Sequence, residues 1–161
     1  MSGVSKTIEK IQKSIADGNY YEAHQMVHSV SQRLFKQKKT QEAVALLFEG
    51  TQSMLNHQEF GSALDLVARL MDIYDTMENP DKDLFLNLFL LFPLKSPSCD
   101  DFVKMVLKWS SKLSNNPLGD PYYHHAFGSR YYAEGLFYDA EFHYVHGTLD
   151  SAKALGRMMV V

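Results

Sequence analysis

The chain has 161 residues, of which 45% are hydrophobic and 22% charged, a balance typical of globular domains and unlike that of disordered chains. Its formal net charge of −3 gives no general attraction to phosphate backbones, which argues against nucleic acid as a partner. The single cysteine, Cys99, excludes an internal disulfide, and the first twenty residues lack a signal-peptide core. We therefore expect a cytosolic protein.

The N-terminal half contains a short repeated pattern that predicts where helices begin. Apolar residues at helical spacing first occur over residues 4–15. An aromatic residue or Thr, two variable residues and Ala then follow one another at 20–23, 40–43 and 60–63, and again at 137–140. The first three copies recur every 20 residues, the length of one helix and one tight turn. Each copy therefore predicts the start of a helix in an antiparallel array.

Beyond residue 78 the spacing loosens, but residues typical of helix ends remain. Residues 79–80 (Asn-Pro) predict a helix start, and Pro93 predicts its end. Residues 98–101 resemble a capping box, in which Ser and Asp side chains cap a new helix. Residues 115–117 predict a break, and residues 120–121 (Asp-Pro) predict the following helix start.

The predicted fold is all-α, because no segment alternates in the manner of a strand. We expect about eight helices in two layers, forming an α-solenoid of antiparallel helix pairs similar to the tetratricopeptide class. A single domain over residues 1–161 would contain them. The chain ends in the apolar residues 158–161, where a solenoid would carry a polar capping helix, so we expect a longer parent protein.

Two helices carry polar or aromatic residues on the face opposite their apolar stripe. On the helix that begins near residue 20 these include Tyr21, Gln25 and His28, and Tyr is enriched in protein interfaces. Asp65 and Asp72 form an acidic strip with Arg69 on the helix that begins near residue 60. Alternating helices of a two-layer solenoid share a layer, so both faces are expected on one surface, about 10 Å apart between axes. Two ordinary explanations stay open: Tyr21 covers a neighbouring turn, and Asp65 pairs with Arg69.

Catalytic and metal sites find little support in the sequence. The histidine pairs His24 with His28 and His143 with His146 have helical spacing, but two ligands are too few for a metal site. Cys99 has no histidine within thirteen residues, and no phosphate-binding glycine motif is present. We therefore predict that the chain is not an enzyme and holds no cofactor or metal.

The sequence resembles one known family along most of its length. The string from Gly18 to Met26, GNYYEAHQM, resembles the opening GDYYEAHQ of the Golgi to ER traffic protein four family. Further matches follow in the same order as in that family: Arg33, Glu42-Ala43, Trp109-Ser110, Gly119-Asp120-Pro121-Tyr122 with His124, Gly128-Ser129, Ala140-Glu141, Gly147-Thr148 and Asp150-Ser151. The C-terminal half of the family has no counterpart in these 161 residues.

The resemblance implies a scaffold in the guided-entry pathway for tail-anchored membrane proteins. Its N-terminal half would dock the dimeric, nucleotide-loaded targeting ATPase, and the absent half would hold a ubiquitin-like adaptor that recruits chaperones. The residues expected to contact the ATPase are Tyr21, His24, Gln25, His28, Arg33, Asp65, Arg69 and Asp72. A structural subunit of another cytosolic helical-repeat assembly is the alternative, and a helical-repeat enzyme with a histidine metal site is a third hypothesis.

Overall fold

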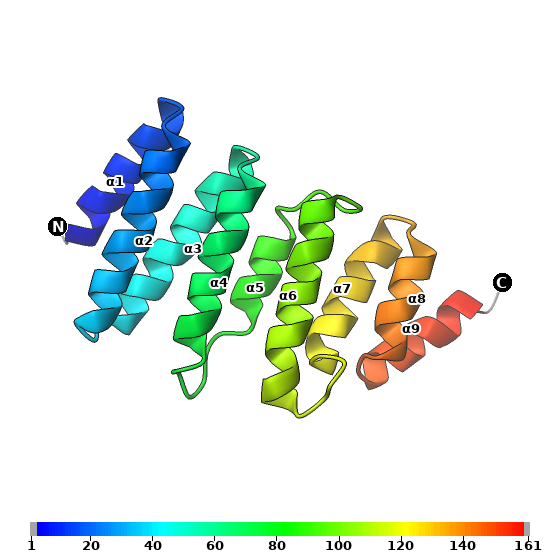
Figure 1. The fold of residues 1–161 in the computed structure, drawn as a ribbon. Helices are drawn as coiled ribbons and strands as arrows, with labels where there is room; N and C mark the ends of the chain where they lie inside the picture. Colours follow the sequence, from blue (N-terminus) through cyan, green and yellow to red (C-terminus); the bar gives the residue numbers. More distant parts are fainter. Residues whose placement is uncertain (1–2, 160–161) are drawn as a thin grey trace. The chain divides into compact units, whose positions relative to one another are not determined.

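A computed structural model describes residues 3–159, which form nine α-helices, one more than the sequence predicts. The helices pack as sequential antiparallel pairs (Figure 1), which confirms the predicted all-α solenoid. Their bounds are α1 Gly3–Ala16, α2 Tyr20–Lys36, α3 Thr40–Asn56, α4 Phe60–Tyr74, α5 Asp83–Phe89, α6 Pro97–Ser114, α7 Pro121–Ala133, α8 Phe137–Val145 and α9 Leu149–Met159.

The helices belong to two compact units, the first ending at Phe92 and the second beginning at Pro93. In the first unit α1, α2, α3 and α4 pack consecutively, α1 and α5 also contact α3, and α2 contacts α4. The odd-numbered and even-numbered helices therefore form two layers. In the second unit α6, α7, α8 and α9 pack consecutively, and α7 also contacts α9. A single domain over residues 1–161 stays a prediction.

The repeated pattern marks the helix starts correctly, because α2, α3, α4 and α8 begin at its aromatic residue or Thr. Each of these helices follows a Schellman turn, whose central residue has a positive φ. In the turn after α1, the Gly18 amide donates to the Ile15 carbonyl at 3.0 Å and the Asn19 amide donates to the Ser14 carbonyl at 2.7 Å. The equivalent positive-φ residues in the other three turns are Lys38, Gln58 and Gly135. One compact turn thus ends a helix and positions the next.

The alanine of each pattern lies in the core. Ala23, Ala43, Ala63 and Ala140 are fully buried, and a small side chain at these positions lets neighbouring backbones approach. Most of the predicted apolar stripes are also buried, which confirms the helical period of the first unit. The predicted roles of Val4 and of the apolar end at residues 160–161 lie outside the described side chains.

Two predicted helix starts are wrong. The fifth helix begins at Asp83 and not at residues 79–80, because the Asp81 carboxylate accepts from the Asp83 amide at 3.0 Å and closes a local turn there. The sixth helix is capped by Ser96 and not by Ser98, since the Ser96 hydroxyl oxygen accepts from the Cys99 amide at 3.1 Å. The predicted start of the seventh helix is correct: the Asp120 carboxylate accepts from the Tyr122 amide at 3.0 Å.

Candidate partner-docking face

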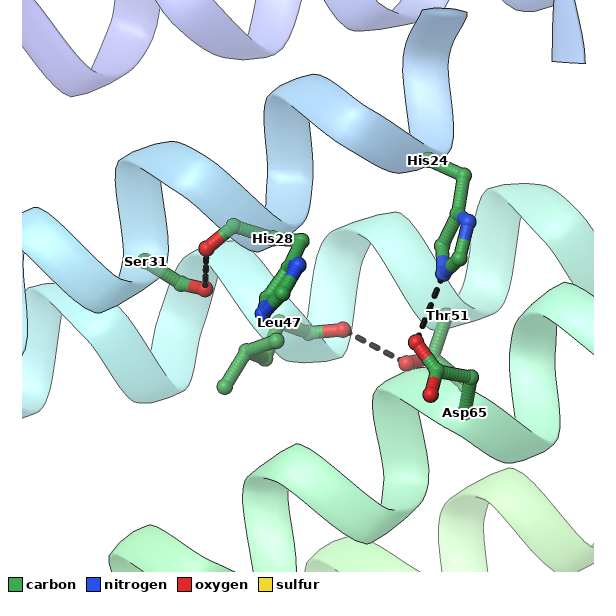
Figure 2. Close-up of polar contacts among 6 residues, drawn as sticks. All are labelled: His24, His28, Ser31, Leu47, Thr51 and Asp65. Carbon is green, nitrogen blue, oxygen red and sulfur yellow. Dashed lines mark hydrogen bonds and ion pairs between the residues drawn. The ribbon is translucent and has the colours of Figure 1, made fainter. Parts of the chain in front are cut away.

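The even-numbered helices of the first unit present one continuous face, as the solenoid prediction requires. A hydrogen bond joins them, since the His24 Nε2 atom on α2 lies 2.7 Å from the Asp65 Oδ2 atom on α4 (Figure 2). A carboxylate can only accept, so the imidazole carries its proton on Nε2. Both side chains are partly exposed. This bond therefore ties the two candidate helices together at the surface.

The Asp65 carboxylate is thus engaged across helices and not with Arg69, the partner that the i, i+4 spacing offered. Helical spacing compares residues of one helix only, whereas the His24 ring reaches Asp65 from 41 residues away. Asp65 consequently helps to hold α2 and α4 in position relative to each other. Its predicted role as a direct contact stays a prediction.

A shallow groove of about 170 Å³ runs between α2 and α4. Both helices contribute polar side chains to its rim, and the hydroxyl of Ser31 donates to the His28 carbonyl at 3.0 Å (Figure 2). The residues that line it are His28, Ser31, Gln32, Phe35, Leu47, Arg69, Asp72 and Ile73. The groove combines apolar residues with histidine, cationic and anionic groups, a mixture that protein interfaces also contain.

Tyr21 and Gln25 are exposed on α2, the helix that also carries His24 and His28. The Tyr21 side chain is 77% exposed, so the ordinary explanation that it covers a neighbouring turn does not hold. An exposed aromatic ring on a helix that also lines a mixed-charge groove has the character of an interface anchor. These two residues extend the face beyond the groove.

Arg33 does not join this group. It lines a separate groove of about 350 Å³ with Thr7 of α1 and with Lys39 and Glu42 at the start of α3. All eight residues predicted to contact a partner therefore lie on α2 and α4, but Arg33 lines a different groove from the one between these two helices. Five residues of the groove between α2 and α4 are absent from the predicted set: Ser31, Gln32, Phe35, Leu47 and Ile73. Ile73 was missed because its spacing places it with the core, where it is in fact buried.

The structure also bears on the metal-binding, catalytic and membrane-spanning alternatives. Within residues 3–159 no group of three or more His, Cys, Asp or Glu side chains has the geometry to hold a metal ion. Cys99 is fully buried on α6, and burial raises the pKa of its thiol to about 11, unlike a reactive nucleophile. No helix in the described part of the chain is long and apolar enough to cross a bilayer.

The second unit contains a histidine cluster that helical spacing did not predict. Helical spacing pairs His143 with His146, but the ring that bonds to His143 belongs to His124 on α7. The two Nδ1 atoms are 3.0 Å apart, and the ring centroid of His146 lies 5.5 Å from that of His124. His124 and His143 come from different helices, so no sequence pattern within one helix would have revealed the contact.

The family model described as Golgi to ER traffic protein 4 matches residues 37–161 of the chain. The chain belongs to this family. The family model begins after the candidate residues of α2, but pairwise similarity to individual relatives covers more of the chain. The Golgi to ER traffic protein 4 of Aspergillus fumigatus is 32% identical over 98% of the chain, and that of Schizosaccharomyces pombe is 34% identical over 86%. The Homo sapiens homolog is 32% identical over 89% of the chain.

A crystal structure of Get4 from C. therm. has the same fold as this member of the Golgi to ER traffic protein 4 family. The two superpose with a TM-score of 0.81 and 33% sequence identity over 98% of the chain. The chain covers 52% of that structure, and 50%, 46% and 45% of the Aspergillus, Schizosaccharomyces and human relatives. It therefore spans about half the length of the relatives that it matches.

Proposed function

We propose that this chain is a non-catalytic cytosolic scaffold in the targeting of tail-anchored membrane proteins, and that it docks the dimeric targeting ATPase in its nucleotide-loaded form. Membership of the Golgi to ER traffic protein 4 family supports this role. The observation that carries the choice of surface is the α2–α4 face, where the exposed Tyr21 ring lies on the helix joined to α4 by the His24–Asp65 bond.

The residues of this face would contribute to binding in different ways. Tyr21 is an anchor: a ring that becomes desolvated on binding contributes about 2 kcal/mol, or roughly 30-fold in Kd. Asp72 and Arg69 on the groove rim act on the association rate and its salt dependence. Gln25 and His28 supply polar contacts beside them. His24 and Asp65 keep the two helices in register, so changing either of them alters the face as well as any contact.

Binding kinetics with the purified ATPase, with and without nucleotide, test the proposal. Tyr21→Ala is expected to raise the dissociation rate at every salt concentration, whereas Asp72→Lys slows association mainly at low salt. Tyr138→Ala and Glu134→Lys are matched controls, because both residues are exposed and belong to the second unit. If the test variants bind like the controls, the α2–α4 face is not the docking site. If the unchanged chain does not bind the ATPase, the proposed function itself fails.

The proposed adaptor site lies outside these residues. The chain covers about half of its relatives, and the resemblance assigns the ubiquitin-like adaptor to the half that is absent here. Calorimetry with the purified adaptor is expected to show no binding to residues 1–161. Tight binding would contradict the assignment and would place the adaptor on one of the two units described above.

A further inference from the structure

Two buried histidines join α7 to α8 in the second unit, and their surroundings determine where their protons lie. The His124 Nε2 atom lies 2.7 Å from the carbonyl oxygen of Leu118, and its Nδ1 atom lies 3.0 Å from the Nδ1 atom of His143. A carbonyl can only accept, so His124 carries a proton on Nε2. A neutral imidazole has only one N–H, so the Nδ1 atom of His124 accepts from His143. The fold thus selects one tautomer for each ring.

This arrangement accommodates one proton between the two rings. With both rings fully protonated, two N–H groups would face each other across 3.0 Å, and the hydrogen bond would be lost. A single added charge would lie in an apolar site, because His143 is 5% exposed and stacks on Tyr131 with an interplanar angle of 4°. Phe127 and Phe142 also form T-shaped contacts with the His143 ring. Burial, followed by the neighbouring His124, lowers the pKa of His143 to about 4.

The charged groups around the pair offer little compensation for an added proton. Burial likewise lowers the pKa of His124, and His146 acts in the same direction on both rings. Asp139 on α8 opposes this effect at His143, but its carboxylate is bound to Lys95 at 2.9 Å. Other titratable or polar groups near the pair include Asp120 beside His124, Cys99 and Asp100 of α6 beside Tyr131, Arg130 of α7 near Cys99, and Ser151 of α9, which bonds to His125.

We propose that the His124–His143 pair is a proton-sensitive latch that holds α8 on α7 while both rings are neutral and releases α8 when the pair takes up a proton. In the opened state the imidazole of His143 returns to its ordinary pKa of 6.5, so opening is favoured as pH falls from 6.5 toward 4. Between pH 7.5 and pH 5 the opening equilibrium increases about 30-fold through His143 alone.

Amide hydrogen exchange followed by mass spectrometry tests the latch on the 161-residue chain. After correction for the intrinsic effect of pH on exchange, the residues of α8 are expected to lose protection about 30-fold between pH 7.5 and pH 5, while those of α3 change little. His143→Asn retains an amide donor but cannot titrate, so the loss of α8 protection should move to lower pH. His57→Asn is the matched control, because His57 is exposed at the end of α3. Unchanged protection of α8, or the same loss in His143→Asn, overturns the proposal.

A second measurement does not depend on any variant folding. Nitrogen-15 NMR of the histidine rings distinguishes the tautomers, and it should find the proton of His124 on Nε2 and that of His143 on Nδ1. Both rings should remain neutral at pH 6, below the ordinary histidine pKa. Opposite tautomers, or titration of His143 at pH 6.5 or above in the folded chain, would overturn the proposal even if His143→Asn did not fold.

Discussion

Helices α2 and α3 approach closely at Gly50, and adding one methyl group there tests the packing of the first unit. A Cβ atom at Gly50 would lie 2.8 and 2.9 Å from the two methyl carbons of Val27, well inside van der Waals contact. Both residues are fully enclosed in the core. The methyl groups of Val27 are attached directly to its Cβ, so they cannot swing away as the end of a long side chain can.

The net effect of Gly50→Ala is the difference between two opposing contributions. Replacing Gly by Ala inside a helix stabilises it by about 1 kcal/mol. Overpacking a close-packed core costs about 1–3 kcal/mol, and the rigid Val27 places this site toward the upper part of that range. We therefore expect a net loss of about 1 kcal/mol, or about 3 °C in Tm for a chain of this size.

Urea unfolding followed by circular dichroism measures the change. Gly156→Ala on α9 is the matched control, because a Cβ atom there meets nothing within 4 Å, so this variant should gain stability. Val27→Ala alone should cost about 2 kcal/mol. In the double variant of Gly50→Ala and Val27→Ala, the methyl group added at residue 50 partly fills the space that the shortened residue 27 leaves. The double variant should therefore lose at least about 1 kcal/mol less than the sum of the single variants. A gain in stability from Gly50→Ala similar to that of Gly156→Ala would refute the close approach.

Two further predictions concern backbone geometry and burial. Lys38 and Gln58 adopt φ values of 63° and 61° in their Schellman turns, a conformation that favours glycine. Lys38→Gly or Gln58→Gly should therefore each stabilise the chain by about 0.5–1 kcal/mol, whereas Gly18→Ala should destabilise it. The midpoints of urea unfolding measure both effects. Burial raises the pKa of the Cys99 thiol to about 11 from an ordinary 9.0, so less of the reactive thiolate is present at pH 8. Its reaction with a disulfide reagent at pH 8 should be about 100-fold slower in the folded chain than in urea. Equal rates would contradict the burial of Cys99.

Much of the fold could be predicted from local patterns because the first unit is built from a regular repeat. Each copy of the pattern places an alanine where two backbones meet, and the residue before the pattern closes a Schellman turn. The helix starts at Tyr20, Thr40 and Phe60 were therefore correct. The start predicted at residues 79–80 was wrong because the side chain of Asp81 closes a turn that competes with helix formation.

The candidate face could be predicted only in part. The helical period placed Tyr21 and Asp72 on the outward sides of their helices, where they are exposed. Arg33 joined the predicted set through the family resemblance, and a matched string does not say which neighbouring helix a side chain meets. In the structure Arg33 turns toward α1 and α3, away from the groove between α2 and α4.

The sequence by itself determined the all-α class, the main helix boundaries and the family, because these follow from short-range periodicity, turn residues and matched strings. Tertiary structure alone decided which polar groups meet. His24 and Asp65 are separated by 41 residues, and His124 and His143 by 19. Such contacts depend on how far each helix is rotated and shifted against its neighbour, which is settled by close packing at residues such as Ala23 and Gly50.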